Sequence, residues 1–130
     1  MMASDNLAGK AQTVLGPINP DDLGLTLTHE HLLVDLSPMF SPGHSDSDRD
    51  FFEMPVSLET LSGIRHYGTL NFDNTRLLDV DTAIEETRLF MQYGGGTIVD
   101  ATSIGIARDP VGLARISRAT GANIVMGGSY

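Results

Sequence analysis

The sequence contains no cysteine, which excludes disulfide bonds and thiolate metal ligands. Any metal site must therefore rest on His, Asp and Glu. Positive charge is also scarce: eight Lys and Arg residues stand against seventeen Asp and Glu, and the formal net charge is -9, with a pI of about 4.6. Nucleic acids and anionic membrane surfaces bind clustered basic residues. Because the basic residues here are scattered, we expect neither as a partner.

Long hydrophobic runs are missing as well. No stretch approaches the roughly 18 apolar residues that a membrane-spanning helix needs. Residues 1–6 lack the basic start and apolar run of a signal peptide. We therefore expect a cytoplasmic protein, and 130 residues are enough for one compact domain with its own core.

Apolar spacing predicts alternating strands and helices. Strands are expected at 12–15, 25–34, 97–101 and 123–126, with helices running from residue 79 to the glycines at 94–96 and from residue 109 to 121. This alternation is typical of an α/β fold with a parallel sheet. Residues 35–76 lie between the strand at 25–34 and the helix that starts at residue 79. They contain three prolines and many Ser, Asp and Gly residues, so we expect a long irregular insertion there.

The segment Thr28-His29-Glu30-His31 closes the alternating strand. Residues two apart in a strand point to the same face, so His29 and His31 would present two imidazoles side by side. Neutral imidazole is a common zinc ligand. The spacing alone leaves a metal role and a structural role equally open, because His-x-His is short and common by chance. Glu30 would face the helices, where a buried, paired carboxylate is the better interpretation.

Polar or aromatic residues end three consecutive strands of the predicted sheet. His29 and His31 end the first, Asp100 and Thr102 the second, and Tyr130 follows the third. The carboxyl ends of parallel strands meet at one edge, where functional groups gather in such folds. For Asp100 we favour a simpler role, a hydrogen bond within the loop before the second helix.

These motifs resemble the phosphotriesterase family of the amidohydrolase superfamily. The resemblance rests on residues 9–18 (GKAQTVLGPI), 24–31 (GLTLTHEH), 96–102 (GTIVDAT) and 119–127 (ATGANIVMG), and it leaves out the region 35–76. The long segment after the histidines is more similar to the phosphotriesterase-related and lactonase-like branches.

The resemblance implies a (β/α)₈ TIM-type barrel with two divalent metals, usually Zn²⁺, at its carboxyl mouth. In that family the two histidines of strand one bind a metal, a role that would fall on His29 and His31. Later strands supply the other ligands, and a metal-activated hydroxide attacks a phosphoester, lactone or amide centre of a small molecule. Tyr130 resembles an aromatic position that lines the substrate pocket. Relatives are often dimers, so a homodimer is possible here.

A complete barrel takes about 250 residues, whereas three parallel strands are expected here. We therefore expect the N-terminal part of such a barrel, preceded by a short N-terminal strand and truncated after the third parallel strand. No catalytic residue is identifiable in it. Two alternatives stay open: a catalytically inactive product or interaction module, and an unrelated small α/β domain whose histidines are structural.

Overall fold

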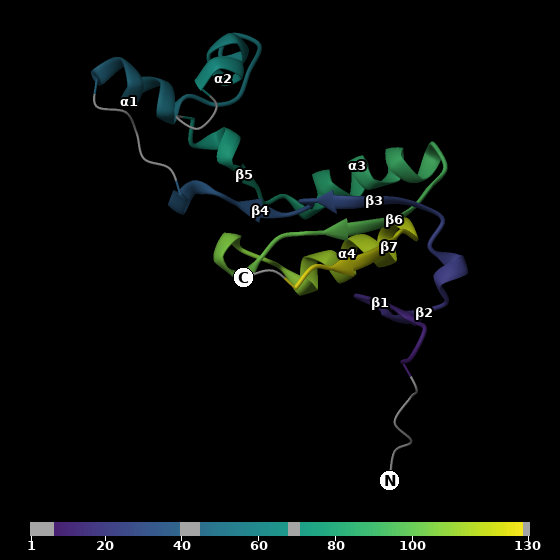
Figure 1. The fold of residues 1–130 in the computed structure, drawn as a ribbon. Coiled ribbons are helices and arrows are strands. Elements are labelled where there is room, and N and C mark those ends of the chain that lie inside the picture. Colours follow the sequence, from purple (N-terminus) through teal and green to yellow (C-terminus); the bar gives the residue numbers. More distant parts are fainter. Residues whose placement is uncertain (1–6, 40–44, 68–70, 129–130) are drawn as a thin grey trace.

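The computed structural model describes residues 7–39, 45–67 and 71–128. Figure 1 shows a small sheet beside two longer helices, with two further helices set apart from the sheet. The strands are β1 Ala11–Thr13, β2 Gly16–Ile18, β3 Leu25–Glu30, β4 Val34–Asp35, β5 Arg76–Leu77, β6 Gly95–Asp100 and β7 Asn123–Met126. The α-helices are α1 Asp46–Glu53, α2 Leu61–Tyr67, α3 Val80–Gln92 and α4 Pro110–Thr120.

The central sheet is parallel, as the alternating pattern predicts. Its strand order is β3-β6-β7, and both neighbouring pairs are parallel. α3 and α4 pack against each other over one face of this sheet. The apolar spacing of the helices produces the core, whose buried members are Leu33, Ala83, Ile84, Leu113, Ile116 and Ile124.

Both long helices begin where the sequence predicts, and an aspartate caps each of them. Asp79 precedes α3, and its side chain accepts a hydrogen bond from Thr82 N at 2.7 Å. Asp109 precedes α4 and accepts from Val111 N and Gly112 N. These bonds satisfy backbone donors that have no partner inside the helix.

The cap at Asp79 makes part of the stability depend on pH. The hydrogen bond from the Thr82 backbone N–H is the main reason why the pKa of Asp79 lies below its usual value. A lowered folded-state pKa means that the ionised group stabilises the fold above about pH 4, and that this contribution is lost as pH falls through the folded pKa. We expect Asp79→Asn, which keeps a capping side chain, to unfold more easily than the native chain at pH 6. The difference should shrink by pH 2.5 in urea denaturation; a gap that stays constant with pH would contradict this.

The expected strand at 25–34 is interrupted, which corrects the prediction. β3 ends at Glu30, and the chain then leaves the sheet to form β4, which pairs antiparallel with β5. The pairing of β3 with β6 is also irregular between Leu27 and Glu30. The chain turns here because Leu32 N donates a hydrogen bond to the side chain of Asp100 at 2.8 Å. This bond replaces the backbone hydrogen bond that Leu32 would form if β3 continued along β6.

The described parts of the segment 35–76 contain more regular structure than their composition indicates. They hold α1 and α2, whereas we expected an irregular insertion. The side-chain amide of Asn71, fully buried, donates to the carbonyl oxygens of Phe51 and Met54, and Phe72 N donates to Phe52 O. Contacts between residues about twenty positions apart therefore organise the segment, and these are not visible as local periodicity.

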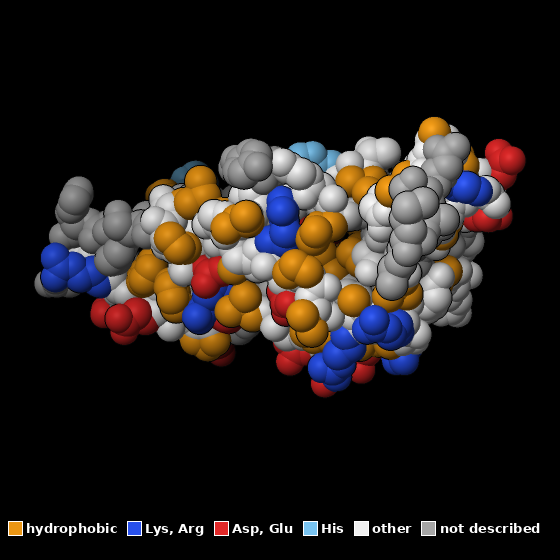
Figure 2. Space-filling model, turned by 90° about the horizontal axis from the view of Figure 1, so that it is seen from below, with side chains coloured by type: hydrophobic (Ala, Val, Ile, Leu, Met, Phe, Trp, Pro, Cys, Tyr) orange, Lys and Arg blue, Asp and Glu red, His pale blue; other side chains and the backbone are white. Residues whose placement is uncertain are grey.

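Several apolar side chains on the sheet are exposed. Leu25 and Leu27 on β3 and Met126 on β7 keep 62%, 38% and 39% of their accessible surface. Figure 2 shows hydrophobic side chains reaching the surface between charged ones. Across the described ranges, no helix is long and apolar enough to cross a membrane. Within the described residues these three side chains belong to β3 and β7, the two edge strands of the parallel sheet, so the apolar surface stays accessible along the strand edges.

Candidate metal site at the strand ends

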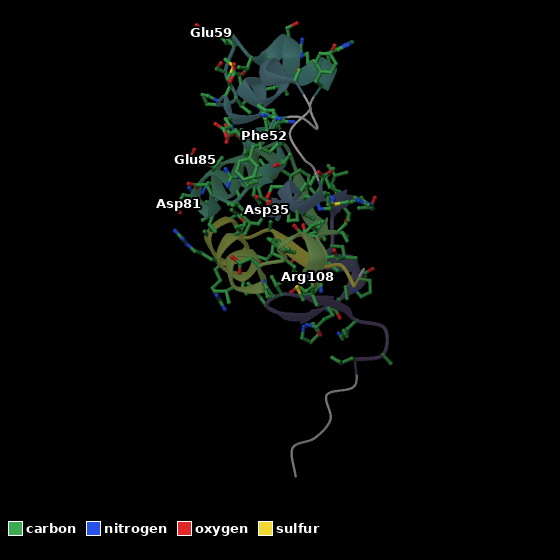
Figure 3. All side chains as sticks on the ribbon, turned by 90° about the vertical axis from the view of Figure 1, so that its left-hand side faces the viewer. Asp35, Phe52, Glu59, Asp81, Glu85 and Arg108 are labelled. Carbon is green, nitrogen blue, oxygen red and sulfur yellow. The ribbon has the colours of Figure 1, made fainter. Side chains whose placement is uncertain are left out.

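The three parallel strands end at one edge of the sheet. Figure 3 looks onto this end, where Asp35 and Arg108 lie. The loop after β3 and the loop after β6 meet there, because Ala101 N donates to Glu30 O at 2.8 Å. The expected convergence of the first two strand ends is therefore present. Tyr130, expected after the third, lies outside the residues that the structure describes.

His29 and His31 lie side by side at this edge. Their ring centroids are 5.5 Å apart and their planes are inclined by 77°. Two imidazoles that bind one tetrahedral zinc through ring nitrogens, each about 2.0 Å from the ion, have centroids about 5 Å apart. The separation of the two rings is close to this value, and His31 follows the end of the strand instead of lying within it. His29 is exposed and His31 half-buried.

Thr102 links the two loops through its hydroxyl group. Its Oγ1 lies 3.0 Å from His31 Nδ1, and the residue is 1% exposed. This contact joins residues 71 positions apart in the sequence. The sequence places both at strand ends but does not indicate that they touch.

Asp100 holds both loops from below the site. It is fully buried, and its carboxyl oxygens accept hydrogen bonds from Thr102 N at 3.0 Å and from Leu32 N at 2.8 Å. The hydrogen-bonding role that we favoured for Asp100 is confirmed. It extends further than expected, because the group also fixes the loop after β3.

Glu30 faces α3, as the alternation predicts. It lines a groove with Glu86, Thr87 and Phe90 of that helix. Its expected pairing is not found: within residues 7–39, 45–67 and 71–128 its carboxylate forms no ion pair or side-chain hydrogen bond. A half-exposed carboxylate at the open edge of β3 is solvated and needs no partner.

Arg76 is a residue beside the site that sequence reasoning missed. It lines a cavity of about 250 Å³ together with His31 and the apolar side chains of Leu32, Leu77, Leu78 and Ala83. Its guanidinium carbon lies 3.9 Å from the ring centroid of Phe72. Arg76 lies opposite Asp35 of the neighbouring strand β4. The pKa of Asp35 is lowered mainly by hydrogen bonds from Ser37 and in smaller part by the positive charge of Arg76. No spacing motif marks Arg76; the β4–β5 pairing brings it here.

Histidine pairs are only part of a metal shell. Among the described residues, no group of three or more His, Cys, Asp or Glu side chains is arranged to hold a metal ion. The two imidazoles are therefore what this part of the chain offers to a divalent ion. A tetrahedral or larger shell needs further ligands.

The parallel sheet, its helices and the polar strand ends place the chain among α/β proteins related to TIM-barrel enzymes. Within that class it belongs to the phosphotriesterase family, whose model matches residues 9–130. This match excludes the alternative of an unrelated small α/β domain.

Individual relatives support the same assignment. The chain is 39% identical over 126 residues to an N-acetyltaurine hydrolase from Salmo salar, covering 95% of this chain and 36% of that protein. A resiniferatoxin-binding protein from Rhodobacter sphaeroides is 44% identical with a TM-score of 0.90, over 95% of this chain and 34% of the other. Organophosphorus hydrolase from Deinococcus radiodurans is 25% identical with a TM-score of 0.58, over 91% and 28%. The chain thus spans about a third of the length of these relatives.

Proposed function

We propose that His29 and His31 are ligands of a divalent metal, with Zn²⁺ as the expected ion, in a hydrolase that acts on an amide, lactone or phosphoester bond of a small molecule. The observation that carries the proposal is the pair of imidazoles 5.5 Å apart at the carboxyl end of a parallel sheet. The names of the relatives, an N-acetyltaurine hydrolase and an organophosphorus hydrolase among them, support hydrolysis of a small molecule.

The chemistry follows from the position of the pair. When bound, a divalent metal supplies an activated water as nucleophile and polarises a phosphoryl or carbonyl oxygen. His29 and His31 hold the ion at the mouth of the sheet, where His29 is open to solvent and to a substrate. The cavity next to His31, with its apolar wall, offers space for a small acyl or alkyl group.

Two histidines alone leave half of a tetrahedral shell to water. A second candidate function follows for the 130-residue chain: metal binding without turnover, or an interaction module that uses the open strand edges. The exposed Leu25, Leu27 and Met126 favour this candidate, since apolar surface of this kind is typical of surfaces that contact another chain segment.

Metal titration of the 130-residue chain tests the proposed ligands. We expect calorimetry to show weak binding of about one zinc ion per chain, and no binding by a His29→Ala/His31→Ala double variant, because that variant removes both imidazoles from the strand end. His66→Ala is the matched control: it removes a histidine of α2 that packs against Tyr67, away from the strand ends, and should bind zinc like the native chain.

Two results would overturn these assignments. Zinc binding that is unchanged in the double variant, with circular dichroism showing an intact fold, would remove the metal role of His29 and His31. Retention of two zinc ions through dialysis, together with hydrolysis of an aryl ester or lactone, would instead refute the candidate without turnover.

A further inference from the structure

We propose that the hydroxyl of Thr102 is a positioning group for His31, holding the imidazole with its proton on Nδ1 so that Nε2 is the metal-binding nitrogen. The inference rests on the proposed metal role of His31 and deepens it. It begins from the contact of 3.0 Å between His31 Nδ1 and Thr102 Oγ1. Because this contact occupies Nδ1, Nε2 is the ring nitrogen left for an ion.

Hydrogen bonds of this kind are a general feature of metal-binding histidines. The ring nitrogen that does not bind the metal usually donates its N–H to an oxygen of the protein, which fixes the tautomer and the orientation of the ring. A threonine hydroxyl has two acceptor lone pairs and can take this proton. The contact found here therefore has the donor and acceptor types that a metal-binding His31 requires.

Thr102 is itself held rigidly. It is 1% exposed, its N–H donates to Asp100 Oδ1 at 3.0 Å, and its carbonyl oxygen accepts from Arg108 Nε at 2.7 Å. A β-branched side chain also has few χ1 rotamers open to it. Its hydroxyl group is thus fixed in space before any metal arrives.

The backbone of His31 is anchored on both sides by the same strand end. On one side Glu30 O accepts from Ala101 N at 2.8 Å, and on the other Leu32 N donates to Asp100 Oδ2 at 2.8 Å. Asp100 lies within the ladder, because its backbone oxygen also accepts from Gly127 N at 2.7 Å. The position of His31 is therefore set by β6 and its following loop more than by β3, which has already ended.

His29 differs from His31 in this respect. Its side chain is exposed, and among residues 7–39, 45–67 and 71–128 its ring contacts the ring of His31 edge to face and forms no side-chain hydrogen bond. The two imidazoles are thus unequal: His31 is oriented by the protein, and His29 is free to rotate onto an ion that His31 already holds. This predicts that loss of the Thr102 hydroxyl weakens the site through His31 alone.

The test compares Thr102→Val, which keeps the shape and removes the hydroxyl, with Thr102→Ser, which keeps the hydroxyl. Long-range ¹H–¹⁵N NMR spectra of the metal-free 130-residue chain report which nitrogen of each histidine carries the proton. We expect His31 to be protonated on Nδ1 in the native chain and in Thr102→Ser, and to lose this preference in Thr102→Val. Zinc affinity measured by calorimetry should fall about tenfold or more in Thr102→Val and recover in Thr102→Ser.

The outcomes separate this inference from the metal proposal. An unchanged tautomer of His31 in Thr102→Val overturns the inference, even if zinc affinity falls. A changed tautomer in a chain that binds no zinc supports the positioning role and refutes the metal role. A tautomer on Nε2 in the native chain also overturns the inference, since Thr102 would then be the donor.

Discussion

Replacing Asp100 with alanine is expected to remove about 2–6 kcal/mol from the free energy of unfolding. Asp100 is fully buried and accepts hydrogen bonds from Leu32 N and Thr102 N. The substitution leaves both donors without their acceptor, and each buried unsatisfied group costs about 1–3 kcal/mol. Domains are stable by only about 5–15 kcal/mol, so much of the stability would be lost. Urea denaturation measures the change.

Asp100→Asn provides the matched control. An amide of the same shape keeps one carbonyl oxygen but sets an NH₂ group against the second N–H, so we expect a loss smaller than that of Asp100→Ala. Amide hydrogen exchange adds a local readout, because protection should fall at Leu32 and Thr102 before it falls in α4. An Asp100→Ala variant with the native unfolding midpoint would show that these two bonds contribute little to the fold.

Sequence patterns predict the regular part of this fold well, because its determinants are local. The helices predicted to start at residues 79 and 109 are α3 and α4, and Asp79 and Asp109 cap them. β7 covers residues 123–126 as predicted. A cap acts within three residues and an apolar stripe within four, so a single sequence holds the information that these elements need.

The triple glycine shows where a local interpretation is incomplete. We expected it to stop the first long helix, but only Gly94, with φ of +90°, lies at that position, and Gly95 and Gly96 begin β6. At Gly96 a Cβ atom would lie 2.5 Å from the carbonyl oxygen of Leu23. This requirement comes from a segment more than seventy residues away, which periodicity cannot reveal.

The candidate site depends on contacts of the same long-range kind. Spacing places His29 and His31 together, and their ring separation of 5.5 Å agrees with that prediction. The contact with Thr102 and the position of Arg76 beside the cavity arise from the pairing of loops and of β4 with β5. The sequence therefore indicates which groups stand at the strand ends, and the fold determines which of them touch.

The core between the helices and the sheet gives the second large expected effect. Ile116 on α4 is fully buried and packs in one cluster with Leu113 and Ile124. Ile116→Ala removes three carbons and leaves a cavity where neighbours are already fixed, so we expect a loss of about 2–5 kcal/mol in the free energy of unfolding. Ile116→Val removes a single methyl group and should cost about 0.5–1.5 kcal/mol.

Val111 on the same helix is the matched control, since 80% of it is exposed. Val111→Ala also shortens a β-branched side chain, but it leaves no cavity, and we expect a change within about 0.5 kcal/mol. If urea denaturation shows the largest loss of stability for Ile116→Ala, a smaller one for Ile116→Val and the smallest for Val111→Ala, then burial, and not helix propensity, sets the cost. If Ile116→Ala were as mild as Val111→Ala, α4 would not be docked on the sheet, and the strand ends that carry His31 and Thr102 would lose their support.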